Sequence, residues 1–350
     1  MTRPPTRALV RSPGVLAGVV VLLLLLSLLL AQQLRGGGSP CAASKKLLVP
    51  PCGAWWGAYV PPGSQGEAAA VQSFEQKIGR RLDLVYTYHD MGTGSDGQLL
   101  TPDEQSLGAT RMLMLSWESD VWDDTGRTPN QHLGWAKIAA GDYDATVIDP
   151  QAERIKAYGR PVLLAFDQEM DTRTPADGTP AQFVAAYRHL HDRFQQLGVT
   201  NVIWVWTVTG YLPHEALMKA LYPGDAYVDW IGYDQYNYFT CKSIPTWHSF
   251  AQTQLPTYTW LRTNISATKP LMLAEYGTAA DPAHPDAQQQ WYQQVPQVVQ
   301  QQLPGVRAVV QWDSSVPGPD CDLSLDHAPA LAGFAEAGRS PYFHQPVRLD

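Results

Sequence analysis

Two stretches of this sequence each end an apolar run in a carboxylate. Residues 161–171 read PVLLAFDQEMD, in which the run 162–166 is too short for a helix and is typical of a strand covered on both faces. Glu169 follows this run, and residues 270–277, PLMLAEYG, place Glu275 at the end of a second one. Two buried strands that each lead to a Glu could supply the paired carboxylates that hydrolysis of a glycosidic bond requires.

Short apolar runs alternate with helical segments from residue 57 onward, which is the pattern of repeated βα units. We expect strands at 57–60, 84–88, 111–117, 162–166, 202–206, 228–233, 271–274 and 306–312. Between them we expect helices at 67–79, 131–140, 149–158, 180–197, 250–264, 287–303 and 328–337. The pattern predicts a single (β/α)₈ TIM barrel over residues 53–345, with a doubly wound open sheet as the alternative.

The segments that follow the strands of such a barrel share one face of the molecule. Here they carry carboxylates, amides and aromatic rings, including Ser116-Trp117-Glu118, Asp167-Gln168-Glu169 and Tyr233 to Asn237. The chain has 12 Trp and 16 Tyr, and aromatic faces suit sugar rings. These residue types predict a saccharide cleft at the carboxyl ends of the strands.

The composition argues against several other classes of function. A net charge of −8 and a pI near 5.6, without a basic stripe, argue against a nucleic-acid partner. No glycine-rich loop that could hold phosphate is present, and no Cys-x-x-Cys or closely spaced His partner suggests a metal site. We therefore expect neither a cofactor nor a metal, and we expect the chain to be a monomer.

The N-terminus has the form of an export signal. Arg3, Arg7 and Arg11 precede an apolar run from Val15 to Ala31, so residues 1–35 are predicted to be a cleaved signal peptide or a retained membrane anchor. Residues 36–52, rich in Gly, Ser, Pro and Lys, are predicted to be a linker. On either interpretation the domain lies outside the cytoplasm, and only the N-terminal segment contacts a membrane.

The four cysteines of an exported protein most simply form two disulfides, for which three pairings are possible. Cys241 follows the predicted sixth strand and Cys321 the eighth, so a bridge between them would brace the loops around the cleft. We therefore favour Cys241 with Cys321, which leaves Cys41 to pair with Cys52.

An ordered series of motifs resembles family 26 of the glycoside hydrolases, the β-mannanase and related endo-glycanase family. The motifs are GAYVPP (57–62), GDYD (141–144), PVLLAFDQEM (161–170), NVIWVW (201–206), YPGDAYVDWIGYDQYN (222–237), KPLMLAEYGT (269–278) and AVVQWD (308–313). The resemblance implies a (β/α)₈ fold and hydrolysis of β-linked glycans with retention of configuration. It makes Glu169 the acid/base and Glu275 the nucleophile.

The resemblance also suggests roles for residues around the two Glu. Tyr236 matches the family tyrosine that hydrogen-bonds the nucleophile, and Trp312 matches the aromatic platform after the eighth strand. Trp117 is a candidate second platform. Gln168 stands where the family has His and Asp171 where it has Asn, and the Trp common after this stretch is absent. Gln keeps a donor and an acceptor that could position a sugar, but it cannot carry a charge.

Two functions remain open at this stage. The first is a retaining endo-β-glycanase, with mannan as the family's usual substrate and mixed-linkage β-glucan, β-1,3-xylan or a host exopolysaccharide as alternatives. The second is a barrel that binds glycan without cutting it and serves exopolysaccharide binding or export. Retention of both Glu169 and Glu275 favours the first function, because a binding protein needs no such pair.

Overall fold

The computed structural model describes residues 46–122, 129–239, 241, 244–315 and 321–347, all within one compact unit, residues 43–350. Eight parallel strands close into a barrel in the order β1-β10-β9-β8-β7-β6-β3-β2. Their bounds are β1 Trp55–Tyr59, β2 Leu84–Asp90, β3 Met112–Glu118, β6 Val162–Phe166, β7 Val202–Val208, β8 Trp230–Asn237, β9 Leu271–Thr278 and β10 Val306–Trp312. The predicted (β/α)₈ barrel is confirmed, and the open sheet is excluded.

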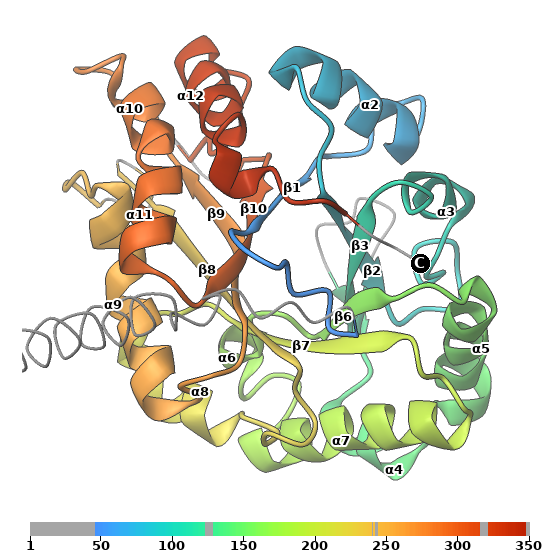
Figure 1. The fold of residues 1–350 in the computed structure, drawn as a ribbon. Coiled ribbons are helices and arrows are strands. Elements are labelled where there is room, and N and C mark those ends of the chain that lie inside the picture. Colours follow the sequence, from blue (N-terminus) through green and yellow to red (C-terminus); the bar gives the residue numbers. More distant parts are fainter. Residues whose placement is uncertain (1–45, 123–128, 240, 242–243, 316–320, 348–350) are drawn as a thin grey trace, which may run out of the picture. The chain divides into compact units, whose positions relative to one another are not determined.

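Helices surround the strands of this unit (Figure 1). The α-helices are α2 Glu67–Ile78, α3 Pro102–Leu107, α4 Trp135–Ala140, α5 Asp149–Tyr158, α6 Met170–Arg173, α7 Pro180–Gln196, α8 Glu215–Ala220, α9 Phe250–Asn264, α10 Ala287–Gln293, α11 Val295–Gln302 and α12 Ala328–Gly338. Three of the helices that the structure describes begin at capping boxes, with Thr101, Thr179 and Ser249 as the capping residues. Such caps satisfy amide groups that a helix start otherwise leaves without partners.

Strand alternation divides the apolar side chains between two cores. One lies inside the barrel and takes alternate residues of the strands, such as Met112 and Met114 of β3. The other lies between strands and helices and takes the residues in between, such as Leu113, Leu115 and Trp117. Because successive side chains of a strand point to opposite faces, this division decides which groups at each strand end reach the barrel interior.

Two of the predicted helices differ in the structure. The helix expected at 131–140 begins only at Trp135, because residues 129–132 form β5 (Pro129–His132), which pairs with β4 (Asp120–Trp122) in an antiparallel hairpin. The helix expected at 287–303 is two helices. Pro296 lies in the first turn of α11, where its missing N–H leaves no hydrogen bond unmade.

Residues 47 and 48 pack against the barrel. Leu48 is buried against the strands of the inner core, and its carbonyl accepts a 2.5 Å hydrogen bond from Trp55 Nε1. The Leu47 carbonyl accepts another, 2.7 Å, from Trp230 Nε1. Trp55 and Trp230 begin their strands, so residues 47–48 cover the amino end of the barrel.

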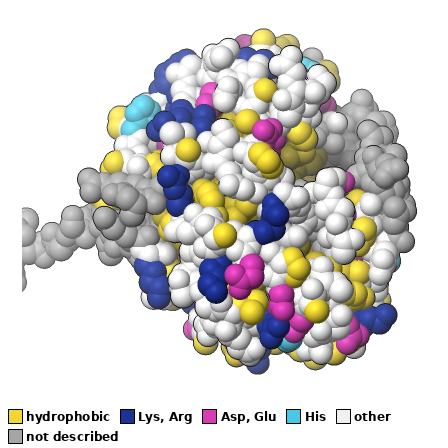
Figure 2. Space-filling model, turned by 90° about the vertical axis from the view of Figure 1, so that its right-hand side faces the viewer, with side chains coloured by type: hydrophobic (Ala, Val, Ile, Leu, Met, Phe, Trp, Pro, Cys, Tyr) yellow, Lys and Arg dark blue, Asp and Glu magenta, His cyan; other side chains and the backbone are white. Residues whose placement is uncertain are grey.

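The predicted signal or anchor, residues 1–35, lies outside the described residues, as does Cys41. Among the described residues, none of the helices combines the length and the apolar character needed to span a bilayer. On the face drawn in Figure 2, Lys and Arg side chains lie scattered among acidic and apolar ones.

Candidate active site

A cavity of about 630 Å³ opens where the barrel strands reach their carboxyl ends. It is lined by Tyr59, Pro62, Tyr88, His89, Asp90, Ser95, Asp96, Thr101, Glu118, Trp122, Gln168, Glu169, Glu275 and Trp312. A second hollow, of about 560 Å³, has Lys46 and Leu47 in its wall and so lies at the other end of the barrel. Its one lining carboxylate, Asp229, already accepts a 2.9 Å hydrogen bond from the Trp204 amide. Of these two cavities, the first contains both predicted catalytic carboxylates.

A bulge in β9 turns Glu275 into this cavity. Both neighbours of β9, the strands β8 and β10, pair with β9 in a register that shifts by one residue just after Leu273. On β8, for example, Tyr233 pairs with Leu273, but the next residue, Asp234, pairs with Glu275. Ala274 lies in the core inside the barrel. Strict alternation would therefore point Glu275 outward, and the bulge allows two consecutive side chains to face inward.

Two phenols hold the Glu275 carboxylate. Tyr88 donates a 2.6 Å hydrogen bond to Oε1, and Tyr236 donates a short hydrogen bond to Oε2. Burial raises the pKa of Glu275 above its ordinary value, and the two phenols oppose that rise by stabilising the charged form. The hydrogen bond from Tyr236 is the one that the family resemblance implies. The hydrogen bond from Tyr88 was not predicted.

This arrangement predicts a shift in the pH dependence of any activity that needs ionised Glu275. Tyr88→Phe removes a donor to the carboxylate, so the pKa of Glu275 should rise further and the acid limb of kcat/KM should move to higher pH. A hydrogen bond to a charged group contributes about 1.5 kcal/mol, which corresponds to roughly one pH unit. Tyr236→Phe should act in the same direction.

The matched control for that pH profile is Tyr187→Phe, because the Tyr187 hydroxyl is buried among helices and strands and has no hydrogen-bond partner among the described residues. An acid limb that stays in place in Tyr88→Phe and Tyr236→Phe would show that Glu275 does not set it.

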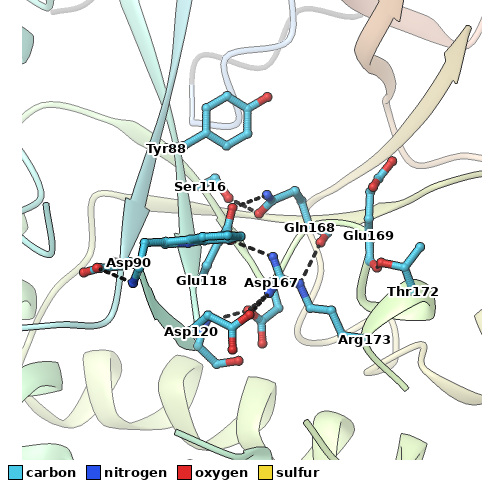
Figure 3. Close-up of polar contacts among 12 residues, drawn as sticks. Tyr88, Asp90, Ser116, Glu118, Asp120, Asp167, Gln168, Glu169, Thr172 and Arg173 are labelled. Carbon is cyan, nitrogen blue, oxygen red and sulfur yellow. Dashed lines mark hydrogen bonds and ion pairs between the residues drawn. The ribbon is translucent and has the colours of Figure 1, made fainter. Parts of the chain in front are cut away.

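Glu169 lies at the turn from β6 into α6 in a left-handed backbone conformation, with φ of 56°. Few non-glycine residues adopt this conformation, and its energetic penalty must be offset by the surroundings. The Glu169 amide donates a 3.0 Å hydrogen bond to the Thr207 carbonyl, and its own carbonyl accepts one of 2.8 Å from the Thr172 amide. Figure 3 shows the Glu169 side chain extending away from the cluster around Gln168 and Arg173. These two hydrogen bonds fix the turn, and the half-buried carboxylate of Glu169 lines the same cavity as Glu275.

Gln168, predicted to contact substrate, lines the cavity but uses its amide within the protein. Its Nε2 donates a 2.5 Å hydrogen bond to Glu118 Oε1, and its Oε1 accepts a short one from Ser116 (Figure 3). Glu118 Oε2 in turn accepts from Arg173, at 2.7 Å, and from Trp122 Nε1, at 3.1 Å. Where the family has a His that can carry charge, this chain has a neutral amide tied to an ion pair.

Arg173, which the sequence analysis did not single out, is the cation of this network. Besides Glu118, its guanidinium lies 2.9 Å from Asp120 Oδ2 and 3.9 Å from Asp167 Oδ1. All three carboxylates are buried. Their charges therefore depend on Arg173 for compensation.

Arg173→Met is expected to destabilise the fold by about 3–5 kcal/mol, because it leaves buried carboxylates without their cation. The free energy of unfolding in urea at neutral pH measures this. Arg193→Met is the control, because Arg193 pairs with Asp149 at 2.6 Å near the surface, where such pairs contribute at most about 1 kcal/mol. Equal losses in the two variants would contradict a special role for Arg173.

Asp171, which replaces the family Asn, serves the loop after β7. Its Oδ1 accepts a 3.0 Å hydrogen bond from the Thr209 amide, and the Thr209 hydroxyl and His214 approach Oδ2. Asp171 is buried and does not line the cavity.

The aromatic predictions have different outcomes. Trp312 lines the cavity and packs against Tyr59, with ring centroids 6.2 Å apart and planes 21° from parallel. The prediction that Trp117 is a platform for a sugar ring is wrong, because Trp117 is fully buried and packs against Phe194 of α7. Strand alternation is the reason: Ser116 and Glu118 of β3 face inward, so Trp117 faces the helices. Trp122 of β4 lines the cavity instead and was not predicted.

The predicted disulfide between Cys241 and Cys321 is present. It lies in a small buried cluster with Tyr236 and Leu323, against which Trp312 packs. The bridge therefore supports two aromatic residues next to Glu275. The other predicted pair involves Cys41, which lies outside the described residues.

Comparison with known proteins finds similarity to one glycoside hydrolase family. The model of glycosyl hydrolase family 26 matches residues 143–300. Endoglucanase H of Acetivibrio thermocellus is 32% identical over 241 residues, which cover 64% of this chain and 24% of that protein. The chain thus spans about a quarter of the length of this relative.

Solved structures of the family share the fold. A ruminal GH26 endo-β-1,4-mannanase has a TM-score of 0.58 at 16% identity, covering 86% of this chain and 67% of that one. A GH26 β-mannanase from Bacteroides ovatus has a TM-score of 0.59 at 14% identity, covering 83% and 89%. At these identities the likeness concerns the fold alone. The match to the family model and the 32% identity to Endoglucanase H both support the resemblance to glycosyl hydrolase family 26 that the motifs indicate.

Proposed function

We propose that this protein is a retaining endo-β-glycanase that cleaves a β-linked polysaccharide by double displacement. The observation that carries the proposal is the pair of carboxylates in one cavity: Glu275, held by two phenols, and Glu169, on a fixed turn. A carboxylate oriented by two donors suits a nucleophile. A second carboxylate that is half-buried on a fixed turn in the same cavity suits a group that exchanges a proton.

In the first step Glu275 attacks the anomeric carbon and forms a glycosyl ester. The bond to the leaving oxygen breaks as Glu169 donates its proton to that oxygen. In the second step Glu169, now ionised, takes a proton from water, and the water oxygen attacks the anomeric carbon and releases Glu275. Tyr88 and Tyr236 stabilise the carboxylate before attack and after release, since a phenol donates most strongly to a charged acceptor.

As the polysaccharide substrate, we propose a β-glucan first and a β-mannan second. Support for glucan comes from the sequence relative, which is named an endoglucanase and is 32% identical. The solved mannanases share 13–18% identity, and one was crystallised with a gluco-manno-oligosaccharide. Gln168, in place of the family His, removes a group that could recognise a sugar hydroxyl as a cation.

The test is release of reducing ends from mixed-linkage β-glucan, carboxymethyl-cellulose, galactomannan and β-1,3-xylan, with Glu275→Ala measured beside the parent. A rapid fall in viscosity relative to the release of reducing ends identifies internal cleavage. Proton NMR of the first product identifies retention, because the β-anomer appears before mutarotation. If no polysaccharide is cut but one binds tightly, the non-catalytic glycan-binding function replaces this proposal.

We also propose that the domain acts outside the cytoplasm as a monomer, delivered by residues 1–35. The disulfide between Cys241 and Cys321 supports an oxidising compartment. Fractionation of cells that produce the full chain would locate it, and mass spectrometry would distinguish a cleaved signal from a retained anchor.

A further inference from the structure

Two aspartates and a histidine meet beside the Arg173 network, and none of the three lines the glycan cavity. Asp120 begins β4, His132 ends β5, and Asp177 lies in the loop before α7. His132 Nδ1 lies 2.5 Å from Asp120 Oδ1 and 2.9 Å from Asp177 Oδ1. The three potential ligand atoms all lie within 4.8 Å of one another. They come from three different segments of the chain.

The hydrogen bonds of this cluster do not satisfy both carboxylates. A histidine Nδ1 carries at most one proton, and the shorter contact assigns that proton to Asp120. Asp177 Oδ1 is buried and accepts no hydrogen bond among the described residues. Burial and the neighbouring charges of Asp120 and Asp167 raise the pKa of Asp177 to about 6. A buried oxygen that accepts no hydrogen bond therefore lies 2.9 Å from the imidazole.

Arg173 faces the other carboxylate oxygen of both Asp120 and Asp177. Its Nη1 lies 2.9 Å from Asp120 Oδ2 and 3.9 Å from Asp177 Oδ2. Each aspartate thus presents one oxygen to Arg173 and the other to His132. Arg173 also neutralises Glu118, so a single guanidinium serves several carboxylates and leaves the cluster with negative charge. The remaining negative charge would attract a cation, and the carboxylate oxygens that face His132 are positioned to bind it.

We propose that Asp120, His132 and Asp177 form a binding site for a divalent transition-metal cation of the Zn²⁺ type. One imidazole nitrogen and two carboxylate oxygens are ligands that Zn²⁺ accepts, with bonds of about 2.0–2.2 Å and water at the fourth position. Ca²⁺ fits less well, because it prefers six or more oxygen ligands. Donor atoms around tetrahedral Zn²⁺ lie about 3.3 Å apart, so the two His132 contacts, now 2.5 and 2.9 Å, must each lengthen by less than about 1 Å. The His132 side chain, 51% exposed, is free to move by this amount.

The cation would fasten the β4–β5 hairpin to the loop before α7. Trp122, two residues after Asp120, lines the glycan cavity and donates to Glu118. The site would therefore fix one wall of the cavity without touching the reacting carboxylates.

The test uses the untagged full chain, stripped with a chelator and titrated calorimetrically with ZnCl₂ and, separately, with CaCl₂. One Zn²⁺ should bind per chain in the micromolar range or tighter. His132→Gln and Asp177→Asn should each weaken Zn²⁺ binding at least about tenfold. The control is His284→Gln, because His284 is exposed and faces a single carboxylate, Asp281, at 2.8 Å. This variant should bind like the parent. Substitution with Co²⁺ should give visible absorption bands in the parent that His132→Gln loses.

Three results would overturn the proposal: no Zn²⁺ binding by the parent, equal binding by His132→Gln and His284→Gln, or Ca²⁺ binding as tight as Zn²⁺. Circular dichroism checks that each variant is folded. If Asp177→Asn does not fold, His132→Gln decides alone, since its half-exposed side chain can be replaced without opening the core. A cluster that is only a histidine ion pair gives the first of these results.

Discussion

Replacement of Glu275 by Ala is expected to lower kcat by on the order of 10⁴-fold or more for every polysaccharide that the parent cleaves. That loss corresponds to about 5.5 kcal/mol on the activation barrier. The reason is that, in the proposed mechanism, the covalent intermediate forms on this carboxylate, which Tyr88 and Tyr236 hold in the cavity. The initial rate of reducing-end release measures the loss.

Azide distinguishes loss of the nucleophile from general damage to the site. In Glu275→Ala the space left by the carboxylate admits azide, which would attack the anomeric carbon of an activated β-glycoside directly and release its phenol. The product is then the α-glycosyl azide, with inverted configuration. Asp96→Ala is the matched control, because Asp96 is an exposed carboxylate on the rim of the same cavity and should be dispensable for attack. A Glu275→Ala variant that keeps parental activity would end the proposed mechanism.

Glu169→Ala has the second largest expected effect, and this effect depends on the leaving group. Polysaccharide cleavage should fall by about 10²–10⁴-fold, the usual contribution of a general acid. Dinitrophenyl glycosides need no protonation of the leaving oxygen, so the glycosyl ester on Glu275 should still form, with a burst of phenol. Its hydrolysis should then be slow, because no base activates water. The rates of the burst and of the steady state separate the two steps.

Azide gives the opposite stereochemical outcome in this variant. It would attack the glycosyl ester in place of water, break the bond to Glu275 and yield the β-glycosyl azide with retained configuration. An equal loss on polysaccharides and dinitrophenyl glycosides would instead assign Glu169 a structural role. The two variants together therefore test the division of roles between the carboxylates rather than the importance of either one.

The barrel and its paired carboxylates follow from local sequence. The run 162–166 coincides with β6, and the run 306–312 with β10, because buried strands of a barrel are short and apolar and end in polar residues. Since the carboxyl ends of the strands share one face, Glu169 and Glu275 were expected to meet there. The same reasoning predicted that Cys241 and Cys321 lie close enough to pair.

Side-chain direction at the strand ends could not be predicted in the same way. A strand covered on both faces has apolar residues at every position, so its sequence does not indicate which alternate set faces inward. Trp117 was therefore assigned to the cleft, although β3 turns it toward the helices. The inward direction of Glu275 depends on a bulge in β9, which is defined only by the registers of β8 and β10.

The sequence by itself determined the fold, the two carboxylates and one disulfide, because each depends on short apolar runs and on the order in which they occur. The tertiary structure alone decided that Tyr88 joins Tyr236 at Glu275, that Arg173 gathers Glu118, Asp120 and Asp167, and that His132 meets two aspartates. Each of these contacts joins residues from separate elements. Hydrogen bonds and charge pairs of this kind leave no periodic pattern in the chain, and they exist only once the closed barrel brings its strand ends and loops together.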